Sequence, residues 1–181
     1  MTITITSLST SLCNLFIECK IFYEYDASKN SLSFSYPSIS EDQLIAIVKN
    51  LNSHETLETP KDLDQAALAI IAQNLHRGAI LRPHPDTDEE KLITLAQNLH
   101  PGVFLIPYLD TDAEQLTVLA ENLNQGAILA TDKDLDQDTL KAIAQNLKPN
   151  TFLLPSPNTN PEKLTVLAKN LNPGVILRPY P

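Results

Sequence analysis

Residues 95–112 read LAQNLHPGVFLIPYLDTD, and closely similar segments recur at residues 119–134, 143–158 and 167–181. From residue 40 onward the chain aligns without gaps in six rows of 24 residues, which begin at Ser40, Asp64, Asp88, Asp112, Asp136 and Asn160. Leucine fills row position 18 in every row, as Leu57, Leu81, Leu105, Leu129, Leu153 and Leu177. A constant period of this length is typical of a solenoid, in which each unit is too small to bury its own apolar face and therefore stacks on its neighbours.

Each row contains the pattern of a helix followed by the pattern of a strand. Row positions 5, 8, 9 and 12 are apolar, which is the spacing of one face of an amphipathic helix. Residues that tolerate a left-handed backbone follow this stretch, at Gly78, Gly102, Gly126, Asn150 and Gly174. A short β-rich segment comes next, such as residues 102–107 in the third row. Each row therefore predicts a helix, a tight turn, a short strand and a return loop.

Polar residues at fixed row positions predict how the helices begin and end. Thr-x-x-Glu capping boxes are predicted at three helix starts, formed by Thr87 with Glu90, Thr111 with Glu114 and Thr159 with Glu162. Pro161 stands where a first-turn proline is tolerated. Asparagine fills position 11 in every row, and we expect its side chain to bind backbone near the helix end.

In these features residues 40–181 resemble the leucine-rich repeat family, whose strand consensus is L-x-x-L-x-L-x-x-N. Residues 144–153, AQNLKPNTFL, are similar to the passage from helix to strand in ribonuclease-inhibitor-type repeats. Two features depart from the consensus: Gly or Asn replaces its first leucine, and proline replaces its third in four rows. The resemblance implies an α/β fold, a curved right-handed solenoid of six 24-residue repeats with parallel strands on the concave face and helices outside.

A narrower resemblance concerns where the protein works. Short acidic chains of such repeats look like the effectors that intracellular bacterial pathogens inject into host cells. The scarcity of cysteine indicates a reducing, cytoplasmic environment, and the effector resemblance implies that this is the host cytosol if the chain is secreted.

Residues 1–39 lie outside the repeat register and predict an N-terminal cap, which leaves 40–181 for the repeats. Residues 9–20 are compatible with a short helix, and residues 21–35 read as two alternating strands around a turn. A solenoid needs such a cap to cover the open end of its core. At the other end, we expect the strand at residues 175–178 to leave an open sheet edge unless a partner covers it.

Charge and composition argue against several kinds of partner. The formal net charge is −9 and the pI is near 4.8, whereas binding to nucleic acid or to an anionic membrane requires clustered Lys and Arg. The sequence has no apolar run of about 18 residues, so no membrane-spanning helix is expected. Cys13 and Cys19 stand close together in a chain that is long enough to fold without a disulfide scaffold.

No cofactor, metal or catalytic centre is predicted. His76 and His100 share a row position and could be neighbours, but the pattern suggests no third ligand, so solvated helix-end residues are the simpler interpretation. The acidic loops at residues 86–88 and 110–112 lack the spacing of a calcium motif, and helix capping explains acids there. The sequence has no nucleophile elbow and no phosphate-binding loop.

The strand pattern predicts a protein-binding stripe. If position 18 faces the core, positions 17 and 19 point to the opposite face of the sheet, because side chains alternate along a strand. The predicted binding residues are Ile80, Phe104, Ile128, Phe152 and Ile176 at position 17, Arg82, Ile106, Leu154 and Arg178 at position 19, and His84, Tyr108 and Tyr180 farther along. The alternative is a strand phase shifted by one residue, in which case this stripe is core.

These patterns predict a non-enzymatic protein-binding module, an inhibitor or adaptor. Its concave face would dock another protein, which the effector resemblance implies is a host protein or a bacterial enzyme whose active site is covered. Two alternatives remain open: the substrate-recognition part of an enzyme such as a ubiquitin ligase, and a structural assembly protein.

Overall fold

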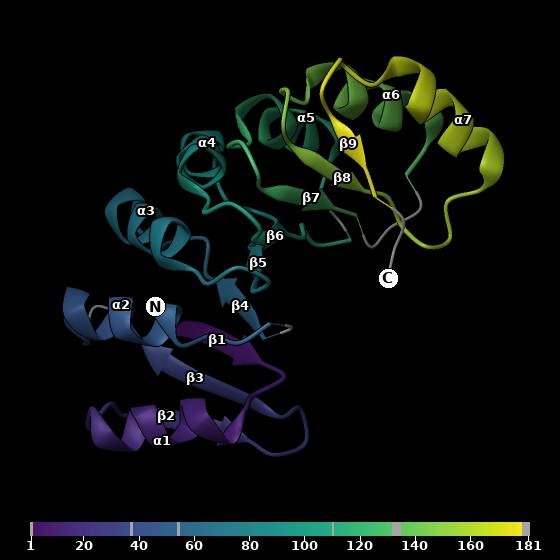
Figure 1. The fold of residues 1–181 in the computed structure, drawn as a ribbon. Coiled ribbons are helices and arrows are strands. Elements are labelled where there is room, and N and C mark those ends of the chain that lie inside the picture. The colour runs from purple at the N-terminus through teal and green to yellow at the C-terminus, as the bar shows by residue number, and fades with distance from the viewer. Residues whose placement is uncertain (1, 37, 54, 110, 132–134, 179–181) are drawn as a thin grey trace.

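The computed structural model describes residues 2–36, 38–53, 55–109, 111–131 and 135–178. Within these ranges nine strands form one sheet, in the order β2-β3-β1-β4-β5-β6-β7-β8-β9. Figure 1 shows the strands along the inner side of an arc and the helices of the repeats along its outer side. The chain is thus an α/β, leucine-rich-repeat-like solenoid, as the sequence predicts.

The six rows all have the predicted order of helix, turn and strand. The helices are α2 (Glu41–Lys49), α3 (Gln65–Asn74), α4 (Glu89–Asn98), α5 (Ala113–Asn122), α6 (Gln137–Asn146) and α7 (Pro161–Asn170). The strands are β4 (Thr56–Thr59), β5 (Ile80–Pro83), β6 (Phe104–Leu105), β7 (Ile128–Ala130), β8 (Phe152–Leu154) and β9 (Ile176–Leu177). They pair in parallel with residues 24 apart opposite each other, for example Ile80 with Phe104, so the sequence period is also the strand register.

The predicted capping boxes are wrong by one residue. Asp88, Asp112 and Asn160 are the N-caps, and their side chains accept hydrogen bonds from the backbone N–H three residues later at 2.8–3.0 Å. The predicted caps Thr87, Thr111 and Thr159 lie one position earlier and are buried. Asp and Asn cap a helix at least as well as Thr, so the cap does not need the threonine hydroxyl. Pro161 lies in the first turn of α7, as predicted.

The predicted left-handed turns are confirmed. Gly78, Gly102, Gly126 and Gly174 have φ between +81° and +91°, and Asn150 has φ of +63°. Their backbones also join the repeats, because the N–H groups of the first four in chain order donate to the carbonyl of the equivalent residue in the next row, as Gly102 does to Gly126 at 2.7 Å. At Gly102 a Cβ would lie only 2.6 Å from Cγ of Arg77. This turn therefore needs glycine both for its backbone conformation and for space.

The asparagine at position 11 has the expected role. In every row its side-chain amide donates to the carbonyl four residues earlier at 2.8–2.9 Å, in Asn50, Asn74, Asn98, Asn122, Asn146 and Asn170. In three rows its oxygen also accepts a hydrogen bond from a glutamine of the preceding helix, for example from Gln73 to Asn98 at 2.7 Å. The asparagine therefore ends its own helix and links it to the helix before.

The N-terminal segment continues the sheet. It consists of β1 (Thr2–Thr6), α1 (Thr10–Glu18), β2 (Tyr23–Asp26) and β3 (Ser31–Ser35). The helix and the two later strands were predicted, but β1 was not, although it pairs antiparallel with both β3 and β4. Glu55 ties this segment to the first repeat, since its buried carboxylate accepts hydrogen bonds from the N–H groups of Ser9 at 2.7 Å and Asn52 at 2.6 Å.

The last strand of the sheet is less protected than the others. Ile176 in β9 is 45% exposed, and Leu177 is half-buried although its equivalents in the earlier rows are fully buried. The reason is that β9 is paired on one side, with β8, in the described part of the sheet. None of the helices in the described ranges is long and apolar enough to cross a membrane.

Candidate functional site

The two faces of the repeat strands carry two separate apolar clusters. Position 18 belongs to the main core, where Leu57, Leu81, Leu105, Leu129 and Leu153 are 0% exposed. Positions 17 and 19 form a second cluster, which we call the concave cluster: Ile80, Phe104, Ile106, Ile128, Ala130, Phe152 and Leu154. The predicted strand phase is therefore confirmed, and the alternative of a stripe that belongs to the main core is excluded.

The concave cluster is only partly open to solvent. Ile106, Ile128 and Leu154 are buried, each 4–6% exposed, whereas Ile80, Phe104 and Phe152 are half-buried. The sequence predicted that these positions point away from the main core, but it did not predict that some of them are buried. Curvature explains the difference, since the concave side of an arc brings the side chains of neighbouring strands together. The accessible apolar surface is therefore concentrated at Ile80, the two phenylalanines and the more exposed Ile176.

Two arginines lie over aromatic rings on this face. Cζ of Arg178 lies 4.5 Å from the ring centroid of Phe152, and Cζ of Arg82 lies 5.3 Å from that of Tyr108. Both distances are within the range of a cation–π interaction. The contact holds the Arg178 guanidinium against the Phe152 ring, and the Arg178 side chain remains exposed to solvent.

A shallow hollow of about 310 Å³ opens at the end of the strands next to the glycine turns. Its apolar side is formed by Phe104, Ile128 and Phe152, and its charged residues are Arg77 and Arg178. The glycine turns and Pro101 complete the lining. We call this the arginine hollow. Arg77 and Pro101 were not predicted as site residues, although their place directly before the turn glycine was visible in the row alignment.

The remaining predicted site residues lie at the other end of the strands. His84 Nδ1 accepts a hydrogen bond from the N–H of Asp86 at 3.1 Å, which orders the loop after β5. Tyr108 follows β6 and lies beneath Arg82. Tyr180 and Asp110 lie outside the described residues.

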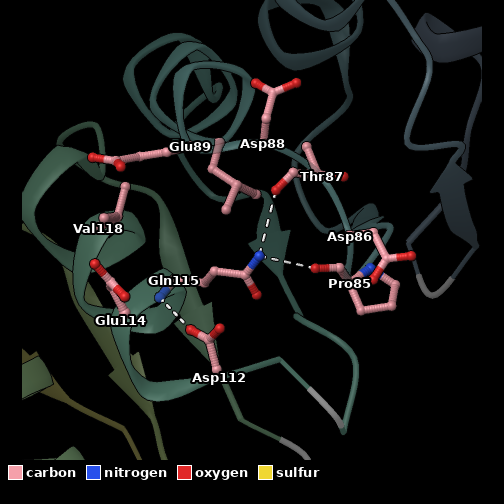
Figure 2. A pocket seen from close by; sticks show the side chains of 10 residues that line it. Pro85, Asp86, Thr87, Asp88, Glu89, Asp112, Glu114, Gln115 and Val118 are labelled. Carbon is pink, nitrogen blue, oxygen red and sulfur yellow. Dashed lines mark hydrogen bonds between the residues drawn. The ribbon is translucent and has the colours of Figure 1, made fainter.

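A second hollow, of about 480 Å³, lies between the starts of α4 and α5 and is lined by several acids (Figure 2). Gln115 points into it and donates to the carbonyls of Pro85 at 2.9 Å and Thr87 at 3.4 Å. Asp88 and Asp112 are N-caps, and hydrogen bonds from the Lys91 backbone and side chain lower the pKa of Asp88. These contacts give the two capping acids and Gln115 structural roles.

The described residues contain no group of three or more His, Cys, Asp and Glu side chains arranged to hold a metal ion. His76 and His100 are both exposed at helix ends. Another polar hollow, of about 490 Å³, lies over the cap strands, and its charged residues are Glu24, Asp26 and Glu58 with one cation, Lys29. The concave side of the sheet is therefore acidic at the cap and carries arginines along the repeats.

Comparison of the chain with known protein families, curated proteins and solved structures finds no match. Its function is therefore inferred from the geometry of the concave face.

Proposed function

We propose that this chain is a non-enzymatic protein-binding module that docks a partner protein on the concave face of β4–β9. The observation that carries the proposal is the concave cluster, an apolar group separate from the main core whose phenylalanines are partly open to solvent. A folded monomer stabilises itself through one continuous core, and a further apolar surface with aromatic and arginine side chains is typical of an interface.

The shape of this face favours a protein over a small molecule. Adjacent strands lie ~4.8 Å apart, so the six repeat strands span about 24 Å. Side chains at equivalent positions of several repeats contribute, which gives a broad shallow surface instead of one enclosed pocket. A stable protein interface buries about 800 Å² on each partner, and a surface of this breadth can supply much of it.

The resemblance of residues 40–181 to leucine-rich repeats supports a finer version of the proposal. The chain would be a member of that family, close to ribonuclease-inhibitor-type repeats, and would act as an inhibitor or adaptor in the cytoplasm. Its partner would be a host protein or a bacterial enzyme whose active site the concave face covers.

Affinity capture with matched baits tests the proposal. The baits are the wild-type chain, the double variant Phe104→Ala/Phe152→Ala, and Lys141→Gln, which removes an exposed charge from the outer helix α6. Proteins captured by the wild type and by Lys141→Gln but lost with the double variant are the expected result. A captured set that is the same for all three baits contradicts docking on this face.

A further inference from the structure

Two of the three arginines of this chain line the arginine hollow. These are Arg77 and Arg178, whereas Arg82 lies over Tyr108 toward the other end of the strands. The chain as a whole has a net charge of −9, so this local positive charge runs against its general composition. Arginine is also the cation that is enriched at protein interfaces and at their energetic centres.

Both guanidinium groups of the arginine hollow are available to a ligand. Among the described residues, neither the Arg77 nor the Arg178 guanidinium has a hydrogen-bond or ion-pair partner. Each is nevertheless positioned: Arg178 stacks on Phe152, and the stem of Arg77 lies against Gly102. An exposed arginine that is held in place loses less conformational entropy when it binds a carboxylate than a freely rotating side chain does.

The glycine turns beside these arginines do not provide a second anion site. Consecutive backbone N–H groups in left-handed turns often bind anions. Here the N–H of Gly78 donates to Gly102, and that of Gly102 donates to Gly126, within the ladder that joins the repeats. An anionic group in the hollow must therefore be bound by the two guanidinium groups.

We propose that the arginine hollow binds an acidic segment of the partner, in which an apolar side chain is flanked by carboxylates. This inference rests on the function proposed above. The apolar side chain would contact Phe104, Ile128 and Phe152, and the carboxylates would form paired hydrogen bonds with Arg77 and Arg178. Such a segment lies over the repeats and not over the cap, because the acids Glu24, Asp26 and Glu58 outnumber the one cation there, Lys29, which pairs with Asp26 at 3.8 Å.

A peptide segment fits this site better than nucleic acid does. Nucleic acid is bound through many phosphate contacts, and its charge is repelled by a chain of net charge −9. Two arginines beside an apolar surface instead complement a ligand that has a few negative charges with an apolar side chain between them.

Fluorescence anisotropy with three pools of short labelled peptides tests the proposal. One pool alternates Asp and Glu with Leu and Phe, the second replaces the acids by Asn and Gln, and the third replaces the apolar residues by Ser. We expect the first pool to bind at least about tenfold more tightly than either of the others. Equal binding of the acidic and amide pools overturns the proposal, as does tighter binding of a single-stranded oligonucleotide or the absence of binding by the first pool.

Substitutions at the two arginines then assign the contact. Arg77→Gln and Arg178→Gln should each weaken binding of the acidic pool about tenfold and leave binding of the amide pool unchanged. Arg178→Lys should bind the acidic pool with an affinity between those of the wild type and Arg178→Gln, since lysine keeps the charge but lacks the planar guanidinium. Lys141→Gln is the matched control, and thermal melts check that each variant is folded.

The outcomes separate this inference from the proposed function. If Phe104→Ala/Phe152→Ala abolishes peptide binding but the arginine variants have no effect, docking on the concave face is supported and the proposal of an acidic segment is wrong. If none of these variants changes the binding of any pool, both are wrong.

Discussion

Phe104 and Leu105 are consecutive residues of β6, yet their side chains belong to different apolar clusters. Leu105 is fully buried in the main core, whereas Phe104 is half-buried in the concave cluster on the other side of the sheet. The same relationship holds for Phe152 and Leu153 two repeats later. One strand thus contributes to folding through one face and presents a candidate binding surface on the other, which allows the two roles to be tested separately.

Gly102→Ala should destabilise the fold by about 1–3 kcal/mol, because alanine is strained at a φ of +84° and its Cβ would meet the stem of Arg77. Asn150 occupies the equivalent turn with φ of +63°, so Asn150→Gly is the matched control. It should change the free energy of unfolding little, because glycine adopts this conformation readily. Denaturant unfolding of both variants measures the difference. Equal stabilities would show that the turn does not constrain its residue.

Glu55→Ala should release the N-terminal cap from the first repeat. The substitution leaves the N–H groups of Ser9 and Asn52 without the carboxylate that accepts from both, at a cost of about 1–3 kcal/mol. Hydrogen exchange should then become faster in β1 than in β7. Uniform acceleration along the chain, or none, would contradict a local role for Glu55.

Asp136 should make stability depend on pH. Hydrogen bonds from the backbone N–H of Thr139 and from its hydroxyl lower the pKa of the Asp136 carboxyl in the folded chain below its usual value of 3.8. A lowered folded pKa gives stability that is present above the unfolded pKa and is lost as the pH falls through the folded pKa. The free energy of unfolding should therefore decrease below about pH 4.

Two variants separate the charge of Asp136 from its capping role. Asp136→Asn keeps an N-cap acceptor but does not titrate, so it should remove this part of the pH dependence. Asp136→Ala should cost about 1 kcal/mol at neutral pH through loss of the cap. Urea unfolding at several pH values checks both, and an unchanged pH dependence in Asp136→Asn would assign the effect to other carboxyl groups.

The sequence predicted the features that repetition makes visible. The constant period of 24 residues predicted the in-register pairing of β4–β9, and the leucines at position 18 predicted the strand phase. Local capping was less predictable, since Thr87 and Asp88 are both good caps and burial of the threonine decides between them. The strand β1 was missed because it lies outside the repeats, although Ile3 and Ile5 alternate with threonine.

The shape of the candidate site could not be predicted from row positions alone. Curvature buries Ile128 and Leu154 within the concave cluster, and this depends on how six repeats pack together. Arg77 and Arg178 are about one hundred residues apart in the chain and line the same hollow only in the folded arc. Single-sequence patterns give the direction of a side chain but not the curvature that brings distant rows together.

The most direct test of the central claim compares Leu105→Ala with Phe104→Ala/Phe152→Ala in thermal unfolding and in binding to a purified captured partner. Leu105→Ala should cost about 2–5 kcal/mol of stability through lost burial and a cavity, while its folded fraction keeps wild-type affinity. Replacement of the two phenylalanines should cost less stability per residue than Leu105→Ala does. It should weaken partner binding by at least about 2 kcal/mol, roughly thirtyfold in Kd. If the phenylalanine variant binds like the wild type, the concave face is not the docking surface.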